Sequence, residues 1–157
     1  KRFINWYSGS YNIQTENSIQ ALGNGGIFGV GIGKSIIKDG FMPEVHTDFI
    51  LPIIGEEIGF IGIVFIFLFY LILYFYGIKI CKSAPDIFSS MLSFGISINI
   101  LYYFLINASY VVGIFPTTGL PIPFISYGGS QMLFSLLSMG ILLNISRFTN
   151  VYKYKSL

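Results

Sequence analysis

The stretch IGFIGIVFIFLFYLILYFYGI, residues 58–78, decides the fold. It contains 21 residues without a charge, enough for one α-helix to cross a hydrocarbon core about 30 Å thick. Lys79 and Lys82 follow and place positive charge at the end of the apolar run. The sequence therefore predicts a transmembrane helix, which we expect to span about residues 51–79.

A second long apolar region follows toward the C-terminus. Between Asp86 and Arg147 there are 60 residues without Asp, Glu, Lys or Arg, which is too many for one crossing. The region divides at IFPTTGLPIPFISYGGS, residues 114–130, because its prolines and glycines interrupt a helix. We expect helices at about 87–113 and 130–146, joined by a re-entrant loop.

The composition also indicates a membrane protein. Of the 157 residues, 54% are hydrophobic and 10% are charged, with a mean hydropathy of +0.72, whereas an average soluble domain has about 25% charged residues. The net charge of +2 is too small to indicate a nucleic-acid partner. One cysteine excludes an internal disulfide and a multi-thiolate zinc site. We expect an all-α, polytopic membrane helix bundle with three transmembrane helices in residues 51–157.

The positive charges predict the orientation of this bundle. Cytoplasmic flanks of transmembrane helices carry an excess of Lys and Arg. Lys79 and Lys82 end the first expected helix, and Arg147 follows the third. We therefore expect a cytoplasmic C-terminus. Residues 1–50, a large irregular glycine-rich loop without the apolar stretch of a signal peptide, and the 114–130 loop would then share the outer face.

A polar segment, PEVHTDFI at residues 43–50, lies at the edge of the first expected helix. If residues 48–78 form one continuous helix, it is about 46 Å long, against roughly 40–45 Å for a bilayer with its headgroups. Asp48 would then lie near headgroup depth. A plain helix N-cap at Thr47 or Asp48 is the alternative, and the residues alone leave both interpretations open. For His46, a structural hydrogen bond is more common than metal ligation.

The loop at residues 114–130 combines stiff prolines with uncharged hydroxyl and backbone amide groups. Such groups suit a sugar or a pyrophosphate, and the glycines before the third helix could offer free N–H groups to an anion. A structural turn is the alternative. With the polar segment, the loop supplies the candidate substrate-binding residues: Glu44, His46, Thr47, Ser126, Tyr127, Gly128, Gly129 and Ser130.

The glycine-rich stretch GNGGIFGVGIGKS, residues 23–35, is not a phosphate-binding P-loop. That motif requires glycine five residues before the glycine of the GKS triplet, and Phe28 stands there. Close backbone packing in a tight loop is the favoured interpretation.

Two acids, Glu56 and Glu57, stand at the entry to the first expected helix. They could complement the helix dipole. Because apolar residues surround them, we expect at least one to face the bundle interior in a structural polar network.

Several of these stretches together resemble the C-terminal part of the SEDS family, the shape, elongation, division and sporulation proteins that include FtsW and RodA. The matching stretches occur in the family's order: ALGNGGIFGVGIGKS (21–35), PEVHTDFILPIIGEEIGFIG (43–62), GIFPTTGLPIPFISYGGS (113–130) and GILLNISR (140–147). They are distributed over most of the chain, from residue 21 to residue 147, and correspond to only about the last third of a family member.

The resemblance implies a bacterial cytoplasmic-membrane protein of about ten helices that polymerises lipid II into peptidoglycan. It implies a class B penicillin-binding protein as the crosslinking partner, together with other divisome or elongasome proteins. It further implies that Asp48 is the essential acid of a cavity open to the extracytoplasmic face, lined by FISYGGS. With three of about ten helices, the chain alone is expected to be inactive.

The chemistry leaves two roles for Asp48. It acts as the general base on the acceptor sugar hydroxyl, or it holds a divalent cation, Mg²⁺ or Mn²⁺, that assists the leaving lipid pyrophosphate. No other cofactor is assigned. A flippase for lipid-linked sugars is the alternative function, and a structural fragment that docks on a partner's transmembrane helix is a third.

Overall fold

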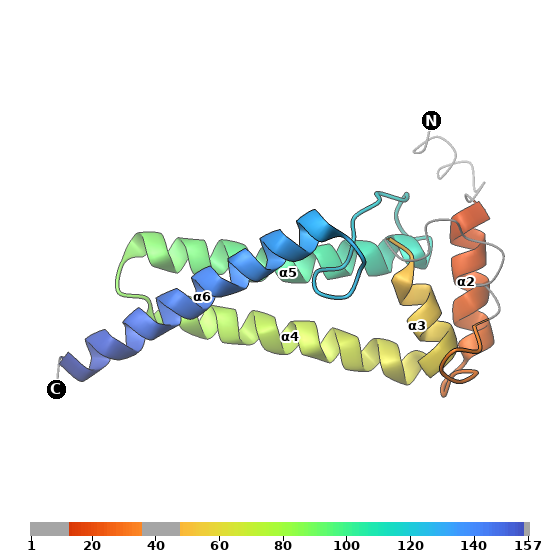
Figure 1. The fold of residues 1–157 in the computed structure, drawn as a ribbon, viewed down its shortest axis with the longest axis horizontal. Coiled ribbons are helices and arrows are strands. Elements are labelled where there is room, and N and C mark those ends of the chain that lie inside the picture. The colour runs from red at the N-terminus through yellow and green to blue at the C-terminus, as the bar shows by residue number, and fades with distance from the viewer. Residues whose placement is uncertain (1–12, 36–47, 156–157) are drawn as a thin grey trace.

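The computed structural model describes residues 13–35 and 48–155, and every regular element in these ranges is a helix. Three helices are long and apolar enough to cross a membrane, and they run along the long axis of the molecule (Figure 1). The two shorter helices lie together at one end (Figure 1). The expected all-α membrane bundle with three spans is confirmed. The helices are α2 (Ile13–Gly25), α3 (Ile50–Ile58), α4 (Phe60–Ser83), α5 (Ile87–Val111) and α6 (Gly129–Lys155).

Helices α4 and α5 form an antiparallel hairpin that packs closely because small residues meet between them. A Cβ atom added to Gly77 would lie 1.8 Å from the Ser97 hydroxyl, so only glycine permits this approach. Further along, the rings of Tyr70 and Phe104 stack with their centroids 4.7 Å apart, and both residues are buried. Most other apolar side chains of α4 face outward, as expected for a helix surrounded by lipid.

The hairpin turns at Asp86, which caps the N-terminus of α5. Its carboxylate accepts hydrogen bonds from the backbone N–H and the hydroxyl of Ser89, each at 2.8 Å. These two bonds favour the charged form and hold the pKa of the Asp86 carboxyl below its ordinary value.

The cap predicts a pH dependence at the start of α5. A lowered pKa in the folded state contributes stability above the ordinary aspartate pKa of about 3.9, and this contribution is lost as the pH falls through the folded pKa. We expect the amides of the first turn of α5 to exchange faster in acid. Asp86→Asn keeps the cap without this pH dependence, whereas Asp86→Ala exchanges faster at every pH. Hydrogen exchange of residues 87–91 measures both effects, and equal rates in the alanine variant would contradict the assignment.

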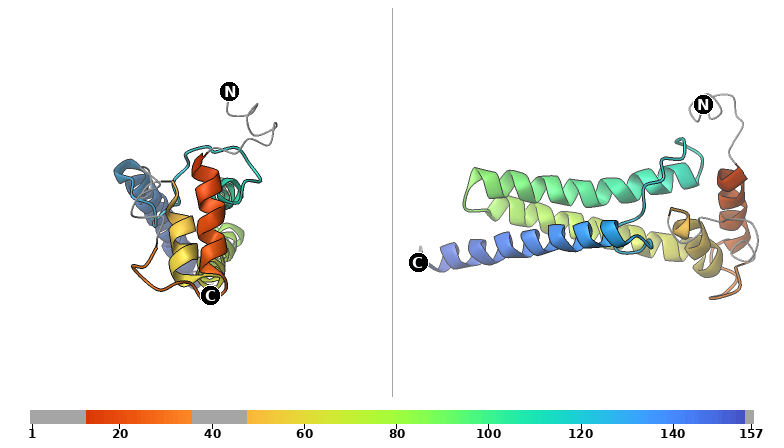
Figure 2. Two further views of the ribbon diagram at one scale, coloured as in Figure 1. Left: turned by 90° about the vertical axis from the view of Figure 1, so that its right-hand side faces the viewer. Right: turned by 45° about the horizontal axis from the view of Figure 1, so that its top comes forward.

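The first expected helix is in fact two helices, which corrects the prediction of one helix over 51–79. Helix α3 ends and α4 begins at Gly59, whose φ of 81° is a left-handed conformation that favours glycine. A Cβ on Gly59 would lie 2.4 Å from both the Gly29 nitrogen and the Ile27 oxygen, so the chain packed there imposes the break. Helix α3 turns away from the line of α4 (Figures 1 and 2). The depth of Asp48 therefore does not follow from a straight 48–78 helix.

A helix also occupies part of the segment 1–50, which was expected to be irregular throughout. The buried residues of α2 are Thr15, Ser18, Ala21 and Gly25, which share one face and are all small. This face packs against α3. Small and polar residues give no apolar periodicity, and so the sequence pattern did not reveal the helix.

The connecting loop, residues 112–128, joins α5 to α6 close to the expected bounds of 114–130. The Tyr70 hydroxyl of α4 donates a hydrogen bond to the Pro123 carbonyl, which ties the loop to the middle of that helix. Helix α6 accordingly starts short of the end of α5 that lies nearest α2 (Figures 1 and 2). The loop thus reaches into the bundle instead of lying across its end.

Candidate functional site

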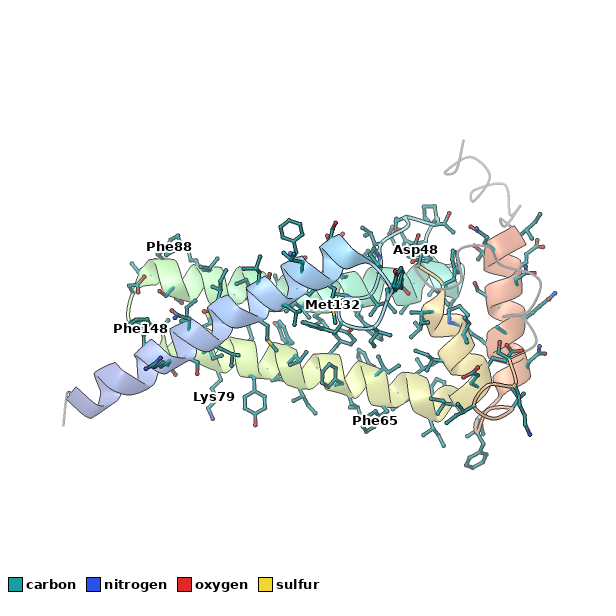
Figure 3. The ribbon with its side chains drawn as sticks, in the orientation of Figure 1. Asp48, Phe65, Lys79, Phe88, Met132 and Phe148 are labelled. Atoms are coloured by element: carbon teal, nitrogen blue, oxygen red, sulfur yellow. The ribbon has the colours of Figure 1, made fainter. Side chains whose placement is uncertain are left out.

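Asp48 lies two residues before α3, at the same end of the molecule as α2 (Figure 3). It is half-buried. Its backbone carbonyl accepts hydrogen bonds from Asn107 Nδ2 and from the Tyr110 hydroxyl, both at 2.9 Å. The last turns of α5 therefore fix the backbone position of Asp48. The predicted site residues Glu44, His46 and Thr47 lie outside the described residues.

The connecting loop lies directly beside the Asp48 carboxylate. A Cβ added to Gly119 would lie 3.1 Å from Asp48 Oδ2. The same Asn107 Nδ2 that contacts Asp48 also donates to the Leu120 carbonyl at 2.8 Å, and Tyr110 Oη lies 3.2 Å from that carbonyl. Two segments that the sequence singled out, the polar segment and the proline-rich loop, thus meet at Asp48.

The FISYGGS half of the loop is arranged differently. Ser126 is buried, and its hydroxyl accepts a hydrogen bond from the Ile122 N–H at 2.9 Å, so this side chain closes a turn of the loop. Tyr127 is 79% exposed. Gly128 is half-buried, and Gly129 and Ser130 are exposed in the first turn of α6. Substrate binding by these residues stays a prediction, and Tyr127 has the freest side chain for it.

Glu56 is a buried acid held by groups from two other segments. It is 0% exposed, and its carboxylate accepts hydrogen bonds from the hydroxyl of Ser35 and, at 3.4 Å, from Asn24 Nδ2 of α2. A buried carboxylate must be hydrogen-bonded, because desolvation is costly. Glu57 is only half-buried. Glu56 thus joins α2, the end of the glycine-rich stretch and α3.

The glycine-rich stretch packs its backbone against the α3–α4 break. Val30 N donates to the Glu56 carbonyl at 2.9 Å, and Gly31 N donates to the next carbonyl at 3.0 Å. In the other direction, the first amide of α4, Phe60 N, donates to the Gly26 carbonyl at 2.9 Å. The stretch therefore satisfies backbone groups that the interrupted helix leaves open. This geometry is close structural packing and contains no phosphate cradle.

The divalent cation considered for Asp48 is not supported by the described ligands. Within residues 13–35 and 48–155, no three His, Cys, Asp or Glu side chains gather as a metal site. We derive no step through a metal ion.

Sequence reasoning assigned no role in the site to Asn107 or Tyr110. Both are 0% exposed in α5, a helix that the sequence identified only by its lack of charge. A signal was present, because an amide and a hydroxyl three residues apart share one helix face, and polar groups at membrane depth need partners. The sequence could not show that their partners are backbone carbonyls of two distant segments.

Comparison of the sequence with known proteins identifies its family. Residues 1–151 match the family of FtsW, RodA and SpoVE, described as cell cycle protein. The chain is 44% identical over 149 residues to a probable peptidoglycan glycosyltransferase FtsW of Bacillus subtilis (strain 168), covering 95% of this chain and 37% of that protein. It is 43% identical over 136 residues to stage V sporulation protein E of the same organism, covering 87% of this chain and 37% of that protein.

A solved structure has the same fold. It is described as "Structural coordination of polymerization and crosslinking by a peptidoglycan synthase complex", and it matches with a TM-score of 0.71 at 23% identity, over 94% of this chain and 41% of that chain. The chain spans little more than a third of the length of its curated relatives, at 37% for both Bacillus proteins. It is a multi-pass membrane protein, and it belongs to the FtsW/RodA/SpoVE family of cell cycle proteins.

Proposed function

We propose that this chain is the C-terminal part of a peptidoglycan glycosyltransferase that polymerises lipid II into glycan strands. The observation that carries the proposal is the Asp48 carboxylate, half-buried beside Gly119 of a loop that enters the bundle. Relatives named probable peptidoglycan glycosyltransferase FtsW, at 44% and 47% identity, support the reaction class.

In this reaction Asp48 acts as the general base. Its carboxylate takes the proton of the acceptor sugar hydroxyl while that oxygen attacks the anomeric carbon of the donor. A new carbon–oxygen bond forms, and the bond to the lipid pyrophosphate breaks, so the pyrophosphate leaves with the electron pair. The activated donor supplies the driving force, and no nucleotide is needed. The structural role of the glycine-rich stretch agrees with this.

The active face is proposed to be extracytoplasmic, with the C-terminus in the cytoplasm. Asp48 lies at one end of the long helices, and Lys79 and Phe148 lie toward the other (Figure 3). Lys79, Lys82 and Arg147 all belong to that second end, where the positive-inside rule places the cytoplasm.

A class B penicillin-binding protein is the proposed partner, contacted through transmembrane helices. The solved complex of similar fold couples polymerization to crosslinking, which supports this choice. Helix α4 presents a wide apolar surface, including Phe65 at 74% exposed and Phe75 at 63%, that suits a helix in the membrane.

The deciding experiment supplies lipid II to the intact protein purified in detergent. We expect glycan chains, resolved by length on a gel, because polymerisation needs no sealed membrane. A lipid II flippase gives no chains in detergent but moves labelled lipid II across vesicle bilayers. Absence of glycan chains from protein that is folded and bound to its transpeptidase would overturn the proposal.

A further inference from the structure

We propose that Asn107 and Tyr110 are positioning residues for glycan polymerisation, because together they hold Asp48 and the connecting loop in one fixed relation. The inference rests on the proposed function. Neither side chain needs to touch substrate. Their contribution is to set where the Asp48 carboxylate stands relative to the loop beside it.

The Asn107 amide is the central link. Its Nδ2 lies 2.9 Å from the Asp48 carbonyl oxygen, 2.8 Å from the Leu120 carbonyl oxygen and 2.5 Å from the Tyr110 hydroxyl oxygen, so its two N–H groups are shared among three acceptors. Rotating the amide by half a turn would face its oxygen toward two carbonyl oxygens. The hydrogen-bond network therefore fixes the amide orientation.

Tyr110, one turn further along α5, binds the same Asp48 carbonyl. Its hydroxyl donates to the Asp48 carbonyl at 2.9 Å and also receives a hydrogen bond from the Asn107 amide. Its ring packs edge-on against Phe49, the neighbour of Asp48, with the centroids 5.6 Å apart. Tyr110 thus holds this short segment by one polar and one aromatic contact.

Burying the Asn107 amide destabilises the fold, and packing alone does not explain why an amide occupies this position. Asn107 is 0% exposed, and its Oδ1 accepts no hydrogen bond within the described part of the chain. An unpaired buried acceptor destabilises a fold, and a leucine of similar volume would avoid it. What leucine cannot supply is two N–H donors for two carbonyls from segments 72 residues apart, at 48 and 120.

The consequence for the reaction is geometric. Asp48 Oδ2 is close enough to the loop that a Cβ on Gly119 would lie 3.1 Å from it. Substrate bound along the loop meets the carboxylate at a distance that the two carbonyl contacts determine. A displacement of about 1 Å in such an arrangement can lower a rate by roughly a hundredfold.

The test compares Asn107→Leu and Tyr110→Phe with wild type in the intact protein, measured per folded molecule. We expect kcat for glycan polymerisation to fall roughly tenfold to a hundredfold with KM little changed. Asn99→Leu and Tyr103→Phe are matched controls, because they change the same residue types on the same helix, where they line a cavity of about 290 Å³ together with Pro123 and residues of α6. These controls should keep wild-type kcat.

A second readout does not depend on the reaction. In Asn107→Leu, hydrogen exchange of peptides covering 48–53 and 114–126 should rise together, and in Asn99→Leu neither should change. If Asn107→Leu does not fold, kcat of the Tyr110→Phe variant, which keeps the aromatic ring, tests the positioning role instead.

Three results would overturn the inference or its basis. Wild-type kcat in the Asn107 and Tyr110 variants would refute the positioning role. A lower yield of folded protein with unchanged kcat per folded molecule would assign the two residues to stability alone. An inactive wild-type protein would instead remove the proposed function, and the exchange measurement would still decide whether the two segments are joined.

Discussion

Asp48→Asn lowers the rate of glycan polymerisation from lipid II by a factor of about 10² to 10⁴, the usual contribution of general acid–base catalysis. Asparagine has nearly the same shape as aspartate but cannot take up the proton of the acceptor hydroxyl. The backbone contacts to Asn107 and Tyr110 involve the Asp48 carbonyl, so the substitution leaves them in place. The expected loss is therefore chemical and not structural. Initial rates of lipid II consumption by the intact protein measure it.

The matched control is Glu57→Gln. It also neutralises one half-buried carboxylate. Glu57 lies in the last turn of α3, however, whereas Asp48 lies just before the first turn. Its rate should stay close to wild type, and the thermal midpoints of both variants should agree with wild type. Undiminished polymerisation by Asp48→Asn would remove Asp48 from the mechanism, whatever the control does.

Gly25→Ala destabilises the fold by about 3 kcal/mol, at the upper end of the usual cost of overpacking. A Cβ on Gly25 would lie 2.0 Å from the Gly55 carbonyl oxygen and 2.8 Å from the Glu56 Cα. These are backbone atoms, so no side-chain rotation relieves the clash, and α2 must separate from α3. The midpoint of thermal unfolding in detergent measures the change.

The neighbouring substitution Gly23→Ala should have the opposite sign. Gly23 lies in the same helix, and nothing stands within 4 Å of its added Cβ. Replacing glycine by alanine inside a helix then stabilises by roughly 0.5–1 kcal/mol. Equal effects of the two substitutions would show that α2 does not pack on α3 as described.

The parts of the fold that follow from local properties could be predicted from the sequence. The apolar run 58–78 is long enough to span a membrane whatever it packs against, and α4 covers nearly all of it. The break at Gly59 could not be predicted. Glycine occurs in ordinary membrane helices, so its presence does not indicate a break. The positive φ at Gly59 depends on close packing against Ile27 and Gly29, which lie about 30 positions earlier in the sequence.

Part of the candidate site could also be predicted, because the placement of charges along the chain is a local property of the sequence. Charge placement put Asp48 and the connecting loop on one side of the bundle, and the structure brings the carboxylate next to Gly119 of that loop. The groups that hold them there are Asn107 and Tyr110, whose partners are main-chain carbonyls. Every residue has such a carbonyl, so no pattern of side chains reveals which one is bound.

The packing at the α3–α4 break has a consequence for how this protein can vary. Three of the hydrogen bonds that seat the glycine-rich stretch there run from main chain to main chain, and their donors are Val30 N, Gly31 N and Phe60 N. Several apolar side chains of the same stretch point outward, with Phe28 79% exposed and Ile32 84% exposed. Substitution at these outward positions leaves the interlocking hydrogen bonds intact. The stretch can therefore change its outer surface, and with it the neighbours that it meets, while the scaffold that carries Asp48 stays the same.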